Sequence, residues 1–526
     1  MVFTRSLTAC FLVLLITQST LGEKFLSIDI EPATIEITGG NRQTQILITG
    51  RRMDRPPVDL THQAKISIVD NQVATLSESL VLGLREGQTS LLVNVEGVET
   101  SIPVIVRGYK DYPAVSFEGD IIPLLTKRHC NSGGCHGRQG GQNGFQLSVF
   151  GFDPITDFEA LTRQSRGRRV FPGAIEQSLI YSKATGLVAH GGGSRMKGDS
   201  QDAELLREWI NQGFPWGSTD TPTVAHIDVT PKSRSMTPRA FQQLRVVATY
   251  SDGSIRDVTR AAAYTTNTAV IAECNSNGVI ETGKLAGEAA ITISYMGKVA
   301  VARVIIPLPG TDKVIRPAWF TNQNEIDNRA WAKWEQLRIH PSEQCDDATF
   351  IRRLFIKTTG TLPTSGQVQE FLADESANKR ATAIEEALES EDYINYWTQR
   401  WSDIMMINSK TIGGRSAYTF HRWIRKQIQE NRPYDDWVYD VIVATGNTGN
   451  VGPANFYRSQ RTPEDVTKAI SQAFLGIRMD CAQCHHHPFE KWGQADFYGL
   501  AGFFNGLQRV KLDENRELIY HPGHQS

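Results

Sequence analysis

The sequence predicts a multidomain protein: two all-β sandwiches, a small all-α domain inserted between them, and a mainly α C-terminal domain. Three observations lead to this prediction. A chain of 526 residues is too long for a single hydrophobic core. Residues 24–108 and 226–307 consist of short alternating or β-branched runs punctuated by Gly, Pro and Asn, which is typical of sandwiches. Residues 113–217 and 324–505 instead space their apolar side chains as helices do.

The N-terminus has the pattern of a secretory signal peptide over residues 1–22. Arg5 supplies a positive charge, an apolar run over residues 10–16 follows, and small residues near Gly22 suit cleavage. The apolar run is shorter than the roughly 20 residues that a membrane span requires. We therefore expect an exported protein, periplasmic or at the cell surface, with no membrane span after removal of the signal. An uncleaved anchor is the alternative.

The composition bears on the classes of function. The chain is 40% hydrophobic and 21% charged, with a formal net charge of −2, as in soluble globular proteins. Because nucleic-acid binding requires a basic surface, a nucleic-acid partner is not expected. The sequence shows no phosphate-binding loop, dinucleotide fingerprint, Ser/His/Asp arrangement or carboxylate pair at a defensible spacing. Whether the protein is an enzyme is therefore left open.

The second β-rich segment carries the more specific pattern. Residues 244–250 alternate as a strand, and residues 251–254 contain Asp-Gly for a hairpin turn. The run Tyr-Ser-Asp-Gly-Ser-x-Arg-Asp-Val-Thr, with the later Gly-Val and Ile-x-Ile-x-Tyr-x-Gly, resembles a bacterial immunoglobulin-like (Ig-like) group 2 domain. Residues 24–108 resemble it more loosely. The resemblance implies two Ig-like sandwiches without catalytic residues, which act as spacers or contact a cell surface or polysaccharide.

Between the two β-rich segments, the pattern becomes helical. Residues 121–127 form a short amphipathic run that leads into Cys130, and a glycine-rich stretch over residues 140–144 is expected to be a flexible loop. A further helix is expected over residues 202–210. Its apolar face consists of Ala203, Leu206, Trp209 and Ile210.

Cys130, Cys135 and His136 have the order of a c-type haem attachment motif. In such a motif two thiols bond the two vinyl groups of the porphyrin, and the next residue places an imidazole on the iron. Together with Phe-Gln-Leu-Ser-Val-Phe-Gly, Arg-Arg, His-Gly-Gly-Gly and Leu-Arg-Glu-Trp-Ile-Asn-Gln-Gly further along, the motif resembles the cytochrome c-like domain of large secreted planctomycete proteins. The resemblance implies covalent haem c on Cys130 and Cys135, with His136 as the proximal ligand. The four residues between the cysteines depart from the ordinary spacing of two.

A second axial ligand for this haem is expected near residues 190–196. Met196 lies 60 residues after His136, a suitable distance for a distal loop. The glycines after His190 would let the backbone approach the porphyrin closely. A methionine ligand raises the reduction potential relative to two histidines. The alternatives are a core or surface methionine at Met196 and a solvent-exposed loop histidine at His190.

Cys481, Cys484 and His485 form a second motif, with the ordinary Cys-x-x-Cys-His spacing. Cys-Ala-Gln-Cys-His-His-His-Pro-Phe, with Arg-Arg-Leu-Phe and Asn-Arg-Pro-Tyr-Asp earlier in residues 324–505, resembles a planctomycete domain of unknown function that bears a CAQCHxHPF motif. The motif predicts a second haem c on Cys481 and Cys484, with His485 as the proximal ligand. Its distal ligand is not distinguished by sequence, and a five-coordinate iron is one expectation. The candidates are His421, Met405, Met406, His521 and His524.

Residues 506–526 are expected to be a tail. The partner domain that usually follows this planctomycete family is absent, so a truncated chain is expected there.

The sequence therefore favours an exported c-type cytochrome-like protein that carries two haems and transfers electrons to a redox partner protein that the sequence does not identify. Two alternatives stay open. The Cys and His motifs could be zinc sites or disulfides in a cell-surface binding or scaffold protein. The helical domain could act on a polysaccharide.

Overall fold

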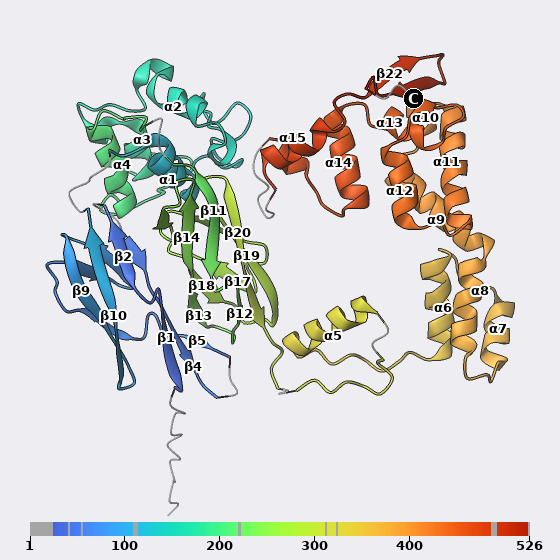
Figure 1. The fold of residues 1–526 in the computed structure, drawn as a ribbon, viewed down its shortest axis with the longest axis horizontal. Helices are drawn as coiled ribbons and strands as arrows, with labels where there is room; N and C mark the ends of the chain where they lie inside the picture. Colours follow the sequence, from blue (N-terminus) through green and yellow to red (C-terminus); the bar gives the residue numbers. More distant parts are fainter. Residues whose placement is uncertain are drawn as a thin grey trace, which may run out of the picture. The chain divides into compact units, whose positions relative to one another are not determined.

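The structure is a computed structural model. It describes residues 25–39, 43–53, 56–108, 114–218, 222–310, 313–321, 324–484 and 492–523, so the predicted signal peptide lies outside the described residues. Two β-rich regions and a helical C-terminal region are present (Figure 1), in agreement with the multidomain organisation that the sequence predicts. Within the described ranges, every helix is too short or too polar to span a bilayer.

The described residues divide into two compact units. The first contains those before Ala114 together with Ser235–Arg245 and Gly278–Thr282. The second contains Ala114–Arg234, Val246–Asn277 and the residues from Gly283 onward.

The first β-rich region is organised into three sheets, with strand orders β1-β4-β5, β2-β10-β9-β6 and β3-β8-β7. In β2, Ile35 and Ile37 are buried while the residues between and after them are exposed, which is the alternation predicted for a sandwich strand. Glu96 and Gly97 both have positive φ and close the β9–β10 hairpin, as a tight turn matched to strand twist requires. The strands are β1 (Ser27–Glu31), β2 (Ile35–Thr38), β3 (Gln43–Gln45), β4 (Leu47–Arg51), β5 (Val58–Asp59), β6 (Lys65–Ile68), β7 (Ala74–Ser77), β8 (Leu80–Gly83), β9 (Gly87–Val95) and β10 (Val98–Arg107).

The second β-rich region repeats this topology. The order β11-β14-β15 repeats β1-β4-β5, the order β20-β19-β16 repeats β10-β9-β6, and β13 pairs with β18 as β3 pairs with β8. The predicted hairpin turn over residues 251–254 is confirmed: it joins β14 to β15, and Gly253 has φ 81°. The strands are β11 (Val224–Thr230), β12 (Ser233–Ser235), β13 (Phe241–Gln243), β14 (Arg245–Tyr250), β15 (Ile255–Asp257), β16 (Ala263–Thr266), β17 (Ala272–Cys274), β18 (Val279–Thr282), β19 (Gly287–Tyr295) and β20 (Lys298–Ile306).

Between the two β-rich regions, residues 114–218 form a small helical segment with its own apolar core. All four residues of the predicted apolar face of α4 are buried, and Trp209 at its centre contacts Phe117. The Ser200 side chain accepts a hydrogen bond from the Ala203 amide and thereby caps the helix. The helices are α1 (Ile122–Lys127), α2 (Pro154–Thr162), α3 (Leu179–Ala184) and α4 (Gln201–Asn211), with short turns η1 (Phe117–Ile121), η2 (Val149–Gly151), η3 (Gln164–Gly167) and η4 (Ile175–Gln177).

The C-terminal region is mainly helical, and several of its helices begin at a polar capping residue. Asn324 caps α5, Asp346 caps α6, and Thr364 forms a capping box with Gln367 at the start of α7. The helices are α5 (Glu325–Leu337), α6 (Asp347–Thr358), α7 (Ser365–Ala373), α8 (Lys379–Glu389), α9 (Glu391–Ile404), α10 (Ser409–Ile412), α11 (Gly414–Gln429), α12 (Tyr434–Ile442), α13 (Phe456–Ser459), α14 (Pro463–Phe474) and α15 (Gln494–Gly502), with turns η5 (Pro453–Asn455) and η6 (Asp480–Gln483).

The stretch expected to be a C-terminal tail is folded over most of its length. β22 (Gln508–Lys511) and β23 (Glu517–Tyr520) form a hairpin, and β23 also pairs with β21 (Gly446–Asn447). Ile519 of β23 is fully buried in the core of the helical region. β22 and β23 are only four residues long, which is too short for a clear alternation of apolar and polar residues in the sequence.

Candidate functional site

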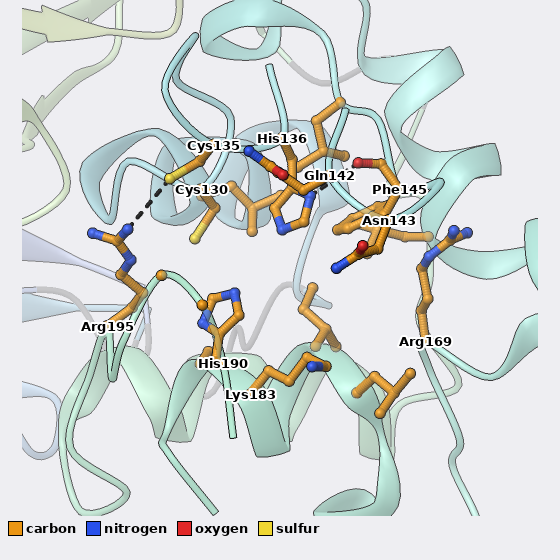
Figure 2. A pocket seen from close by; sticks show the side chains of 18 of the residues that line it. Cys130, Cys135, His136, Gln142, Asn143, Phe145, Arg169, Lys183, His190 and Arg195 are labelled. Carbon is orange, nitrogen blue, oxygen red and sulfur yellow. Dashed lines mark hydrogen bonds between the residues drawn. The ribbon is translucent and has the colours of Figure 1, made fainter. Parts of the chain in front are cut away.

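A cavity of about 780 Å³ lies within the helical segment formed by residues 114–218 (Figure 2). Its volume falls in the range of roughly 300–1,000 Å³ that is usual for ligand and cofactor sites. Much of its wall is aliphatic or aromatic. These apolar lining residues are Leu124, Leu125, Phe145, Leu147, Leu161, Leu179, Ile180, Met196 and Leu206.

Five residues predicted from the sequence as haem-site residues line this one cavity. They are Cys130, Cys135, His136, His190 and Met196. Cys130, Cys135 and His136 lie more than 50 residues before His190 and Met196 in the chain. The fold brings both groups to the same cavity.

The motif loop begins where α1 ends. The Cys130 amide donates to the Leu125 carbonyl, and the His136 amide donates to the Cys130 carbonyl, so the loop closes on itself. Gly137 directly follows the motif in the sequence and is buried. A Cβ at this position would lie 2.1 Å from the Asn131 carbonyl oxygen, so only glycine allows this close approach.

The His136 imidazole is held by a backbone acceptor. Its Nδ1–H donates to the Phe145 carbonyl oxygen at 2.9 Å, which leaves Nε2 as the nitrogen available to the cavity. Burial lowers the pKa of His136, so the neutral, ligating form is favoured. The glycine-rich stretch predicted to be a flexible loop is a tight turn here. It is closed by the Gln142–Phe145 pair, and a Cβ on Gly141 would clash with the Phe145 carbonyl.

His190 lies across the cavity from His136. Its Nδ1–H donates to the Gly193 carbonyl oxygen at 2.9 Å. The two imidazole planes are parallel to within 5°, and their ring centroids are 6.3 Å apart. Figure 2 shows the two rings directed toward one another from opposite walls.

The two thiols lie beside His136. Both are free, and burial raises the pKa of Cys130 to about 11, so this thiol stays protonated at neutral pH. The Cys135 sulfur accepts a hydrogen bond from Arg195 Nη2 at 3.3 Å (Figure 2).

Basic side chains complete the lining. Arg168, Arg169, Lys183 and Arg195 line the cavity, and its lining among the described residues includes no Asp or Glu. The buried Arg169 guanidinium donates to the carbonyls of Ala160 and Gly144, and it stacks over the Phe145 ring at 4.5 Å. No carboxylate among the described residues forms an ion pair with Arg169. The cavity therefore has an uncompensated positive charge that suits an anionic group.

The sequence does not predict this basic lining. Arg168 and Arg169 are the Arg-Arg of the cytochrome c-like resemblance, and Lys183 and Arg195 belong to no motif. Dispersed basic residues carry no periodic or motif signal, and only the fold shows that they share a cavity.

The second motif is described only in part. Cys481 lies in the short turn η6, Cys484 follows it, and both thiols are exposed and free. Met479 and Ala482 beside them are buried in a small apolar cluster with Phe497 of α15. The proximal candidate His485 lies outside the described residues.

The distal candidates for the second motif are dispersed. His421 lies on α11, which packs against α9, α10 and η5, whereas η6 packs against α15. Met405 is fully buried in the core of the helical region, as expected of a core methionine, and Met406 is exposed. His521 follows β23, and His524 lies outside the described residues.

The described residues contain no group of three or more His, Cys, Asp or Glu side chains that could hold a metal ion. Structural zinc usually takes four such ligands. Haem iron, which the porphyrin nitrogens already hold, takes only one or two from the protein.

Comparisons with known proteins give one family match. Residues 325–509, about a third of the chain, match the family model described as "PSCyt2: Protein of unknown function (DUF1549)". This match covers the helical C-terminal region and the Cys481 motif, and its description assigns no activity. No curated protein matches the chain.

Solved structures give only weak likenesses. The structure titled "Structure of the S-layer protein SbsC, domains 5-6" is 12% identical, with a TM-score of 0.22, and the match covers 54% of this chain and 99% of that one. A second structure of the same protein, domains 4–9, is 13% identical with a TM-score of 0.22, and the match covers 55% and 32%. TM-scores this low support no conclusion on fold or function.

Proposed function

We propose that the segment 114–218 binds one haem c covalently in this cavity and that the protein is an exported electron-transfer protein. The observation that carries the proposal is the placement of Cys130, Cys135 and His136 on one wall of a largely apolar cavity, with the His136 Nε2 available to it.

The cavity fits a haem in three respects. Its apolar walls match the porphyrin body, and its volume is that of a cofactor site. Its uncompensated Arg169, with Lys183, matches the two propionates. Figure 2 shows Arg169 and Cys135 at opposite ends of the cavity, as a group with vinyls on one side and propionates on another requires.

The residues of the chain have separable roles in this proposal. Each thiol adds across one vinyl C=C bond: Sγ bonds one carbon and the thiol proton goes to the other, so no oxidant is needed. His136 supplies an axial imidazole, oriented by the Phe145 carbonyl. The leucines exclude water, and the basic side chains neutralise the propionates. The haem, when bound, supplies a one-electron couple whose potential the protein tunes.

We extend the proposal to a second haem c on Cys481 and Cys484, with His485 as the proximal ligand. The Cys-x-x-Cys-His spacing supports it, and the exposed thiols are accessible for attachment. The β-rich regions act as Ig-like spacers, and the N-terminal signal pattern supports export to the periplasm or cell surface.

The test is a pyridine haemochrome assay on the denatured protein, made in a host with haem c maturation machinery. Two covalent haems are expected in the wild type, one each in the double variants Cys130→Ala/Cys135→Ala and Cys481→Ala/Cys484→Ala, and two in Cys345→Ala, a free cysteine outside both motifs. A wild type without covalent haem would overturn the proposal, and zinc in that sample would favour a scaffold protein. An unchanged haem count in Cys130→Ala/Cys135→Ala would overturn the assignment of this cavity.

A further inference from the structure

We propose that His190, not Met196, is the second axial ligand in this cavity, so that the iron is held between two imidazoles. This inference rests on the haem proposed for the cavity above. It names the residue that completes the coordination, and hence the kind of redox site that results.

The spacing of the two rings carries the inference. An imidazole nitrogen lies about 2 Å from a metal that it binds and about 1 Å from the centre of its own ring, so two imidazoles on opposite sides of one ion have centroids about 6 Å apart. His136 and His190 have a centroid separation of 6.3 Å and parallel planes. Two side chains from distant parts of the chain thus match the separation expected of two ligands to one iron.

The tautomer of His190 is fixed in the same way as that of His136. In both residues Nδ1–H donates to a backbone carbonyl at 2.9 Å, Phe145 for His136 and Gly193 for His190. This second hydrogen bond orients a ligating imidazole and leaves Nε2 for the metal.

The loop that carries His190 is anchored at its far end. The amides of Arg195 and Met196 both donate to the Ala184 carbonyl at the end of α3, at 2.7 and 3.1 Å. A Cβ on Gly192 would lie 3.0 Å from the His190 ring, so glycine gives the imidazole room. Gly193 has φ 72°, and its carbonyl is the acceptor for His190.

The position of Met196 is explained by its packing in the apolar core. It is 5% exposed and belongs to the apolar core of the segment, together with Leu206 and Trp209 of α4. An unbranched thioether fills such irregular core space well. Met196 touches the cavity as part of its apolar wall.

Two imidazoles fill both axial positions. The site then has no open position for a small ligand, and its reduction potential is lower than that of a histidine–methionine site. A low-potential electron carrier is therefore expected rather than a ligand-binding or oxygen-activating centre.

The experiment uses the full-length, haem-loaded protein with Cys481→Ala and Cys484→Ala, so that only this cavity reports. Carbon monoxide binding to the reduced form and the midpoint potential are measured for His190→Ala, His190→Met and, as the matched control, Met196→Leu. The unsubstituted site is expected not to bind carbon monoxide. His190→Ala should bind it, and His190→Met should shift the potential upward. Met196→Leu removes the sulfur but keeps an apolar side chain, so this variant should still not bind carbon monoxide.

The outcomes separate this inference from the function it rests on. Carbon monoxide binding gained in Met196→Leu, or no change in either His190 variant, would show that His190 is not the ligand while the covalent haem stands. Absence of covalent haem from all variants and from the unsubstituted site would overturn both. His190→Met keeps the test decisive if His190→Ala does not fold.

Discussion

The buried carboxyl of Asp157 makes the stability of the proposed haem domain dependent on pH. It lies on α2, fully buried, and accepts hydrogen bonds from the amide and hydroxyl of Ser148 at 2.5 and 2.7 Å. The preceding Leu147 amide donates to the His136 carbonyl. Asp157 therefore holds the segment that flanks the motif loop. Burial raises its pKa to about 6, although the bonds from Ser148 oppose this shift.

The sign and size of the effect follow from linkage. The folded state holds the Asp157 proton more tightly than the unfolded chain, whose pKa is 3.8. The stabilisation is thus fully present below about pH 4 and is lost as pH rises through about 6. A shift of about two pKa units corresponds to about 3 kcal/mol in all, of which about 2 kcal/mol falls between pH 4.5 and pH 7.

The perturbation is Asp157→Asn, which keeps the shape of the side chain and removes its titration. The free energy of unfolding of residues 114–218 is measured at each pH by equilibration in urea, followed by pulsed hydrogen exchange at one common pH. The lowered pKa of His136 gives an opposite dependence in the same window, since its stabilisation is lost as pH falls. Comparing variant with wild type at each pH cancels that contribution.

Between pH 4.5 and pH 7, the wild type is expected to lose about 2 kcal/mol relative to Asp157→Asn. Equal dependence on pH in the two proteins would refute the reasoning, because it would mean that Asp157 titrates alike in the folded and unfolded chains.

Two further predictions concern the cavity. Gly137→Ala should abolish covalent haem at this site, because its Cβ would meet the Asn131 carbonyl oxygen at 2.1 Å. The control Gly133→Ala should retain the haem, because a Cβ there has nothing within 4 Å. Equal haem content of the two variants in the pyridine haemochrome assay would contradict the proposed steric cause. Arg169→Gln should weaken haemin binding by the apo-protein about tenfold, because a charge-assisted contact to a propionate is lost. Arg163 is exposed, so the control Arg163→Gln should leave the affinity unchanged. Equal affinities of the two variants in fluorescence-quenching titrations would exclude Arg169 from this role.

Local signals in the sequence predicted much of the secondary structure. The buried face of α4 and the Asp-Gly hairpin each depend on a few neighbouring residues, so the sequence alone suffices to find them. α8 and α9 are two helices rather than one, because the Ser390 side chain accepts from the Tyr393 amide and starts α9.

Features that depend on contacts between distant residues leave no local signal in the sequence. The motif predicted His136 as a ligand, but His190 and Met196 could not be ranked until the facing rings were seen. The charge of Arg169 became significant only once the fold showed it buried without a carboxylate partner among the described residues. The four-residue strands at the C-terminal end lack enough residues to show a period.

The hairpin at the end of the helical region sets a boundary for recombinant fragments. The family match ends at residue 509, within β22, yet Ile519 fills the core of the region and its removal would cost about 1.5–3 kcal/mol of apolar burial. Cutting the chain there would also remove Glu517, which lies 3.7 Å from the buried Arg458, and leave that cation without its carboxylate. A fragment designed to isolate the Cys481 motif should therefore extend at least to residue 520, because one that stopped at the matched residues would be prone to aggregation.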